Sequence, residues 1–244
     1  MTVSSRRPPR PVPEFKDVPT WKAPRIINSH LPEEKIPEQI YQGKGKVVFV
    51  IRNPKDVAVS FWHFAVPWKF DKRYEDWECF FQMFLEGETI YGSWFDYTLN
   101  FWKKHRYDKN FLFLKFEDMK QDIKGAVIQI ADFLGKPLSE ESINRVIECS
   151  SLESMKRRFN TSASNPQLVK ESPSPGPEIN VDRTPPGTMT TKEILAKYSL
   201  GAAGIIRKGI IGDWKSKLTV AQNEAFDALY REKMVGSGLK IQFE

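Results

Sequence analysis

The stretch Arg-Asn-Pro-Lys-Asp at residues 52–56 has the residue types of an anion-binding site. Asn53 fits the N-cap of a helix, Pro54 its first position and Asp56 its first turn, so a helix is expected to begin here. A helix start directs free backbone N–H groups and the positive end of the helix dipole to one point. Arg52 lies directly before this cap and Ser60 follows on the helix. Because a guanidinium and a hydroxyl both donate to phosphate oxygens, we predict a phosphate site at this turn.

Two further groups of residues have the means for chemistry. Arg207 and Lys208 precede Gly209, which places two cations beside a residue that lets backbone approach a ligand closely. The same three residues also fit a solvated helix end. Histidine side chains ordinarily titrate near neutral pH, so His30 has the residue type of a general base. An isolated histidine is more often a surface or capping residue, and its spacing alone leaves both roles open.

These side chains need strands and helices to position them. The apolar run Val47–Ile51 predicts a buried strand that leads directly into the helix at Pro54. A second strand is predicted at 111–116, and a short one at Ile26 and Ile27, just before His30. Helices are predicted from Trp77 to about Lys104, from Ile123 to Leu134, after Ser139, and at two capping boxes, Thr190 with Glu193 and Thr219 with Gln222. Strands that alternate with helices indicate an α/β fold with a parallel sheet flanked by helices.

Length and composition fit one α/β domain. The chain has 244 residues, of which 40% are hydrophobic, enough for a substantial core. Residues 1–20 are rich in proline and arginine and predict a disordered lead-in, which leaves 21–244 for the domain. Within the domain, residues 159–190 are rich in proline and have no sustained periodicity. We therefore expect an irregular, lid-like segment there.

Composition also excludes several classes of partner. The two cysteines have no pairing pattern or metal-ligand spacing, which favours a reducing compartment and no metal site. No apolar run approaches membrane-spanning length, so we expect a cytoplasmic protein with no membrane partner. The net charge is +6, yet the cations are dispersed outside the first 20 residues. This pattern favours a nucleotide with several phosphates over a nucleic acid.

Several segments, in order along the chain, resemble the cytosolic sulfotransferases, which use 3′-phosphoadenosine 5′-phosphosulfate (PAPS). They are PRIINSHLP (24–32), RNPKDVAVSFWHF (52–64), GETIYGSW (87–94), FEDMK (116–120), RKGIIGDWK (207–215) and KSKLTVAQNE (215–224). The resemblance runs from about Pro24 to the last residue. It implies the P-loop nucleoside-triphosphatase-like sulfotransferase fold. It also implies transfer of a sulfuryl group from PAPS to a hydroxyl or amine of a small apolar acceptor, such as a phenol, a steroid or another alcohol.

The resemblance also implies roles for individual residues. His30 matches the catalytic base, and Asn28 and Ser29 beside it fall in the substrate site. The donor nucleotide would contact the residues at the matching positions: Arg52, Ser60, Phe116, Ser150, Ser151, Leu152, Arg207, Lys208 and Gly209. A short dimerisation pattern is matched by Lys215, Thr219, Val220 and Glu224, which implies a homodimer. The chemistry requires no metal, because the protein supplies the cations.

The chain departs from the family pattern in four places. Asn28 stands where the family usually has lysine, Phe116 where tyrosine is common, and Leu152 where phenylalanine is usual. The fourth departure is the N-terminal strand and glycine-containing loop that wrap the 5′-phosphosulfate, for which residues 1–23 offer no match. The run Gly43–Lys46 lacks the spacing of such a loop and is interpreted as a turn. We therefore expect an N-terminally truncated domain with little activity, and the alternative is a non-catalytic protein of the same fold that binds PAPS or its product PAP, or that dimerises.

Overall fold

Two parallel strands form the sheet in the residues that the computed structural model describes, 24–157 and 206–244. β1 (Val47–Ile51) pairs with β2 (Phe111–Lys115), and the register aligns Val47 with Phe111 and Ile51 with Lys115. Both predicted strands and their parallel arrangement are confirmed, with β2 one residue shorter than expected. Parallel strands need a long connection between them, and here it contains three α-helices and one short helical turn.

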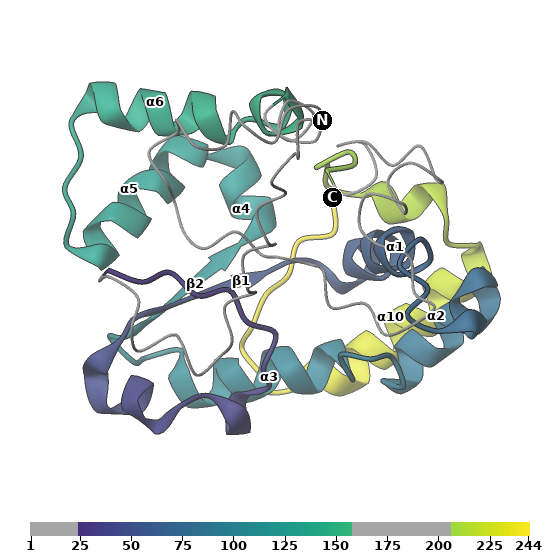
Figure 1. Ribbon diagram of the computed structural model, residues 1–244. Helices are drawn as coiled ribbons and strands as arrows, with labels where there is room; N and C mark the ends of the chain where they lie inside the picture. Colours follow the sequence, from purple (N-terminus) through teal and green to yellow (C-terminus); the bar gives the residue numbers. More distant parts are fainter. Residues whose placement is uncertain (1–23, 158–205) are drawn as a thin grey trace, which may run out of the picture.

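Helices lie on both sides of this sheet (Figure 1). In the view of Figure 1, α3 (Trp94–His105) and α10 (Val220–Met234) lie below the strands. Three helices lie above them, namely α4 (Phe116–Gln121), α5 (Ile123–Leu134) and α6 (Glu140–Ser150). Beyond the end of β1 are α1 (Pro54–Ala65) and α2 (Trp77–Glu86). Short helical turns complete the described chain: η2 (Glu33–Lys35), η3 (Ile40–Lys44), η4 (Lys72–Glu75) and η6 (Asp213–Ser216).

The helix boundaries follow the predicted signals closely. The Ser139 hydroxyl caps α6 by accepting from the backbone N–H of Ser142, and Thr219 with Gln222 forms a complete capping box at α10. The predicted helical stretch from Trp77 to Lys104 is two helices, because α2 ends at Gly87. Gly87 has φ 75°, a left-handed conformation in which glycine has no Cβ penalty. The run Gly43–Lys46, for which the sequence predicts a turn, begins inside η3, and Gly43 there has φ 77°.

Two strand predictions need correction. Ile26 and Ile27 form no strand, and their side chains are 75% and 58% exposed. A strand is stable only with a hydrogen-bonding neighbour, and within the described chain this segment has none. β1 is also only half buried, since Phe49 contacts α3 whereas Val48 and Val50 are 39% and 55% exposed. Side chains alternate across a strand, and only the Phe49 side of β1 is packed into the core.

Some predicted features lie outside the described residues. These are the lead-in at 1–20, the lid-like segment at 159–190, and the capping box of Thr190 with Glu193.

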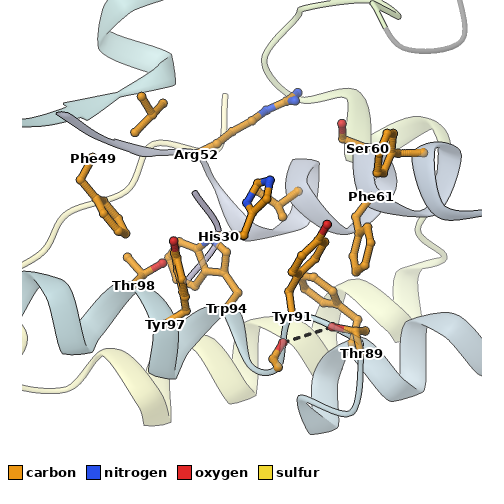
Figure 2. Close-up of a pocket in the computed structure, with 15 residues that line it drawn as sticks. His30, Phe49, Arg52, Ser60, Phe61, Thr89, Tyr91, Trp94, Tyr97 and Thr98 are labelled. Carbon is orange, nitrogen blue, oxygen red and sulfur yellow. Dashed lines mark hydrogen bonds between the residues drawn. The ribbon is translucent and has the colours of Figure 1, made fainter. Parts of the chain in front are cut away.

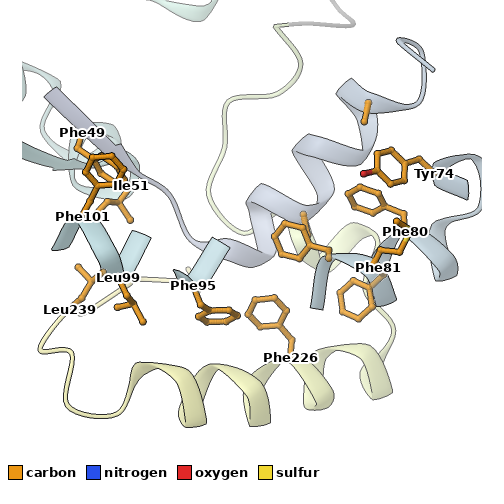
Figure 3. Close-up of a cluster of buried hydrophobic side chains, with 14 of the residues drawn as sticks. Phe49, Ile51, Tyr74, Phe80, Phe81, Phe95, Leu99, Phe101, Phe226 and Leu239 are labelled. Atoms are coloured by element: carbon orange, nitrogen blue, oxygen red, sulfur yellow. The ribbon is translucent and has the colours of Figure 1, made fainter. Parts of the chain in front are cut away.

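Buried aromatic side chains build the core (Figure 3). Phe49 of β1 packs on Phe101 of α3, with ring centroids 4.6 Å apart. Farther along, Phe95 of α3 meets Phe226 of α10, which is completely buried. A third group, at α2 and η4, contains Tyr74, Phe80 and Phe81. Since each buried aromatic ring removes a large apolar area from water, these contacts hold α3 against the sheet, α10 against α3, and α2 against η4 and α1.

A buried lysine joins α1 to α10. Lys55 is only 3% exposed, and its ammonium lies 2.5 Å from Asp227 Oδ1 and donates to Asn223 Oδ1 at 2.6 Å. The same ammonium lies over the rings of Trp214 and Phe243, 4.5 and 5.0 Å from their centroids. A buried charge is tolerated only when it is paired and hydrogen-bonded, and here both conditions are met.

Candidate functional site

The turn between β1 and α1 is fixed by a buried hydrogen-bond network. The side chain of Asn53 accepts from the backbone N–H of Asp56 at 2.8 Å, which confirms the predicted cap, and Pro54 stands at the first helical position as predicted. Glu117 of α4 accepts from the backbone N–H of Asn53 at 2.9 Å. Asn53, Asp56 and Glu117 are all fully buried. The residue before the cap is therefore held rigidly at the end of the sheet.

That residue is Arg52, and its guanidinium joins three segments of the chain. One terminal nitrogen donates to the carbonyl of Ile210 at 3.0 Å and lies 3.3 Å from Asp56 Oδ2. The guanidinium also lies over the ring of Phe116, 4.5 Å from its centroid. Arg52 Nε is buried and has no hydrogen-bond partner among the described residues. Because an unpaired buried donor is costly, this nitrogen is suited to an anion that enters the site.

The cations at 207 and 208 are paired with an internal carboxylate. Arg207 and Lys208 both contact Asp213, which is 3% exposed. Burial alone would raise the pKa of Asp213, but hydrogen bonds from Lys208 and Arg207 outweigh it and hold the pKa below its usual value. Arg52, Arg207 and Lys208 together face two carboxylates, those of Asp56 and Asp213. Arg207 and Lys208 are thus held in place by a carboxylate of their own segment.

Gly209 and Leu152 meet beside these cations. Gly209 has φ 61°, and a Cβ added there would lie 3.4 Å from Leu152 Cδ1. The structure therefore places Leu152 beside the segment 207–214, in which the carbonyl of Ile210 accepts a hydrogen bond from Arg52. The two serines before Leu152 are exposed and make local hydrogen bonds: Ser150 donates to the carbonyl of Ile147, and Ser151 accepts from the N–H of Ser154.

A cavity of about 360 Å³ opens beside Arg52 (Figure 2). Its wall includes His30, Arg52 and Ser60, so the structure brings together three of the predicted site residues from separate segments. The other predicted site residues do not line it. The rest of the wall is mostly apolar and aromatic: Phe49, Val50, Val57, Phe61, Phe64, Phe84, Thr89, Tyr91, Gly92, Trp94, Tyr97 and Thr98.

His30 lies at the mouth of this cavity against Tyr91. Their ring centroids are 4.9 Å apart, and Tyr91 in turn contacts Phe61 at 5.3 Å. Asn28 and Ser29 are exposed and lie outside the cavity wall. The Ser29 hydroxyl accepts from the backbone N–H of Leu31 at 3.1 Å, a local turn that shapes the chain next to His30.

His63, on the same helix as Ser60, lies near the cations. Burial lowers its pKa, and repulsion from Arg207, Lys217 and Lys208 acts in the same direction, against an attraction to Asp213. His63 therefore favours the neutral form. Its ring packs edge-on against Trp62, with centroids 5.0 Å apart.

Sequence reasoning missed most of the cavity wall. Tyr97 and Thr98 follow Trp94 at three and four positions along α3, the spacing that places side chains on one face of a helix. Phe49 and Phe61 lie in apolar stretches of the sequence that fit a core as well as a cavity wall. Helical spacing around Trp94 was the available signal, but it does not distinguish a cavity wall from a core.

Comparison with known proteins gives the family. A family described as "Sulfotransferase domain" matches residues 9–175 and 187–238. The chain is 39% identical over 222 residues to sulfotransferase 2A1 of Macaca fascicularis, across 90% of this chain and 67% of the relative. This chain belongs to the sulfotransferase family. Sulfotransferase 1A1 of Bos taurus is 35% identical over 237 residues, which cover 97% of this sulfotransferase and 70% of that relative.

Solved structures agree with this assignment. Mouse sulfotransferase SULT7A1 complexed with PAP superposes with a TM-score of 0.68 at 30% identity, over 91% of this sulfotransferase and 70% of that chain. Retinol dehydratase in complex with androsterone and inactive cofactor PAP gives a TM-score of 0.64 at 28% identity, over 86% of this sulfotransferase and 53% of that chain. The predicted fold, an α/β sulfotransferase fold with a small parallel sheet flanked by helices, is confirmed. The sulfotransferase spans about two thirds of the length of the curated relatives it matches, 67% and 65% of the first two.

None of the helices in 24–157 and 206–244 has the length and apolarity needed to cross a bilayer. In the same residues, no three His, Cys, Asp or Glu side chains are grouped so as to hold a metal ion.

Proposed function

We propose that this sulfotransferase binds PAPS and transfers its sulfuryl group to a hydroxyl or amine of a small apolar acceptor in the cytoplasm. The observation that supports this most directly is that His30 and Arg52 line one aromatic cavity. The His30 imidazole can accept a proton from the acceptor, and the Arg52 guanidinium can bind a phosphate of the donor. A single cavity therefore offers both functions that the reaction needs. Its volume, about 360 Å³, falls in the range of roughly 300–1,000 Å³ found for small-molecule sites.

The residues present fit the donor nucleotide. Arg52 Nε is a buried donor without a partner among the described residues, Ser60 supplies a hydroxyl, and the Gly209 backbone lies close to Leu152. Arg207 would complete the 3′-phosphate contacts if it exchanged its bond to Asp213 for one to the phosphate. PAPS, when bound, supplies the sulfuryl group and leaves as PAP.

In this mechanism His30 accepts the proton that the acceptor loses as its oxygen or nitrogen forms the bond to sulfur. The contact with Tyr91 keeps the imidazole at the cavity mouth, and the aromatic wall excludes water from an acceptor that lies there. Asn28 replaces a family lysine and lies outside the wall, so it adds no charge to the site. Turnover is therefore expected to be low.

We propose apolar alcohols and phenols as the acceptor class. The wall is rich in aromatic side chains, and solved relatives include retinol dehydratase in complexes with androsterone and with retinol. Thr89 and Thr98 are the hydroxyl-bearing residues of the wall apart from Ser60 and the two tyrosines. A flat, apolar molecule with one hydroxyl group matches this composition.

The nucleotide part of the proposal is tested by calorimetric titration with PAP. We expect binding by the wild-type chain and a roughly 10- to 150-fold weaker affinity for Arg52→Ala, the equivalent of a lost charge-assisted hydrogen bond of about 1.5–3 kcal/mol. Arg106→Ala is the matched control, because Arg106 is exposed and lies at the end of α3. Equal affinity for the wild type and Arg52→Ala would contradict the proposal.

A second candidate function is non-catalytic binding of PAPS or PAP. The observation that favours it is Asn28, which stands where the family usually has a lysine. The two candidates differ in turnover with phenol and sterol acceptors. Turnover that is lost in His30→Ala supports the enzyme, whereas tight PAP binding without turnover supports the binding protein.

We also propose a homodimer through the segment at 215–224. Val220 is 75% exposed at the start of α10, and Glu224 is exposed one turn later. Lys215 pairs with Glu244 at 3.0 Å, and Thr219 caps the helix. An exposed valine at a helix start offers an apolar contact for a second copy.

A further inference from the structure

The position of His30 depends on a segment with little support of its own. Residues 24–31 have no regular secondary structure, and their side chains are exposed. Within residues 24–157 and 206–244, the interaction found for the His30 side chain is its ring contact with Tyr91. What places the imidazole is therefore whatever anchors the chain next to it.

That anchor is Glu33, three residues after His30. Three residues span at most about 11 Å, so a fixed Glu33 leaves His30 only a short tether. Glu33 is 5% exposed although it is charged and lies in an exposed segment. Its carboxylate pairs with the ammonium of Lys104 and lies 3.0 Å from His105 Nε2, both at the end of α3.

Tyr41 adds a third contact to the same residue. Its hydroxyl donates to the backbone carbonyl of Glu33 at 2.7 Å and to the carboxylate at 3.0 Å. Burial raises the pKa of Tyr41 to about 12, with the Glu33 carboxylate acting in the same direction, so the hydroxyl keeps its proton and remains a donor. Both the main chain and the side chain of Glu33 are thereby held.

The charge of Glu33 is stable in this setting. Burial opposes ionisation, but hydrogen bonds from Lys104, His105 and Tyr41 outweigh it and hold the pKa of Glu33 below its usual value.

His105 gives the network a rigid base. Its ring stacks on Phe111 of β2, with centroids 4.1 Å apart and planes 8° from parallel, and on Tyr41 at 5.2 Å and 7°. His105 Nδ1 faces Asp108 Oδ2 at 3.8 Å. Because Phe111 belongs to the sheet, the network connects the segment of His30 to β2.

We propose that Glu33 is a positioning residue, which sets the place of His30 at the cavity through its contacts with Tyr41, Lys104 and His105. An effect of Glu33 on catalysis rests on the proposed function, since it requires that His30 is the catalytic base. The positioning of His30 by Glu33 does not depend on the proposed function. Loss of the Glu33 contacts should release the segment and move the imidazole away from Tyr91, while the nucleotide contacts at Arg52 and Gly209 remain.

The test uses the full chain with ¹³C-labelled histidine. The chain has three histidines, so NMR resolves each ring and His30→Ala assigns the signal of interest. The Tyr91→Leu variant has no ring contact with His30, so the chemical shift of His30 in this variant is the reference for an imidazole that has left Tyr91. In Glu33→Gln we expect the signal to move toward that position, and Tyr41→Phe, which removes one hydroxyl, should give a smaller shift in the same direction. Glu34→Gln is the matched control, an exposed neighbour with the same change of charge.

Kinetics and binding complete the test. We expect Glu33→Gln to lower kcat about 10-fold or more, since displacing a catalytic group by about 1 Å can cost up to ~100-fold. The PAP dissociation constant should stay within about twofold of the wild type. An unchanged His30 signal in both Glu33→Gln and Tyr41→Phe would overturn the proposal, as would kcat and PAP affinity falling together. If the wild-type chain has no turnover, the proposed function fails, and the NMR signals alone decide the role of Glu33.

Discussion

Asp56→Ala is expected to detach the loop at 207–214 from the start of α1. Asp56 is fully buried, and its carboxylate accepts from the backbone N–H of Gly212 at 3.0 Å and of Trp214 at 2.9 Å. The same carboxylate pairs with Arg52 at 3.3 Å and accepts from Asn53 Nδ2 at 2.9 Å. The alanine variant leaves two backbone donors and one guanidinium without their acceptor.

The size of the effect follows from these contacts. Charge-assisted hydrogen bonds contribute about 1.5–3 kcal/mol each, and removing one partner of a buried ion pair costs about 3–5 kcal/mol. The contributions overlap at one carboxylate, so we expect the free energy of unfolding to fall by about 3–5 kcal/mol. Asp56→Asn keeps one acceptor oxygen and should lose roughly half as much.

Urea denaturation followed by circular dichroism measures this loss. At a denaturant dependence of roughly 2 kcal/mol per molar urea, the midpoint for Asp56→Ala should fall by about 1.5–2.5 M. Asp118→Ala is the control, because the Asp118 side chain is 61% exposed and surface changes stay within about 0.5 kcal/mol. A loss below about 1 kcal/mol in Asp56→Ala would refute the reasoning, since the buried carboxylate would then not be what holds the loop.

Three further predictions concern other parts of the molecule. Phe226→Ala removes a fully buried ring between α10 and α3, and guanidinium denaturation should show a loss of about 3–5 kcal/mol; a loss under 1 kcal/mol would mean that the core repacks around the cavity. Asp213 has a pKa below its usual 3.8 in the folded chain, so its stabilisation is complete above pH 3.8 and is lost as the pH falls through the lower folded value. Stability measured across this range should therefore decline less steeply in Asp213→Asn than in the wild type, and parallel curves would contradict this assignment. Val220→Arg places a charge on the proposed dimer contact, and sedimentation should shift from dimer to monomer, whereas an unchanged sedimentation coefficient would exclude this surface.

Local features of the sequence predicted local structure well. The cap at Asn53, the helix at 123–134 and the capping box at Thr219 depend on residues within four positions of each other, and all three are confirmed. The strand predicted at Ile26 and Ile27 is wrong because strand formation depends on a neighbouring strand, which a two-residue pattern does not indicate.

The site depends on contacts between distant residues, and these were less predictable. Arg52 meets Ile210 across 158 positions, and no local pattern contains this contact. The resemblance implied only that Arg52 shares a nucleotide site with residues 207–209. The Glu33 network spans 71 positions to Lys104 and falls outside the quoted motifs, so nothing in the sequence indicated it. The roles of His30 and of the nucleotide residues stay predictions until binding and turnover are measured.

The enclosure of Lys55 gives this sulfotransferase a built-in reporter for amine-reactive reagents. An acylating reagent needs a free, deprotonated amine, and the ammonium of Lys55 is enclosed by Asp227, Asn223 and aromatic rings. It can react only when α10 moves away from α1, so its labelling rate is set by the free energy of that opening. Exposed lysines such as Lys136 react without any opening and provide an internal reference in the same sample. The ratio of the two rates, read by mass spectrometry, would follow local opening of α10 as ligands or variants change it.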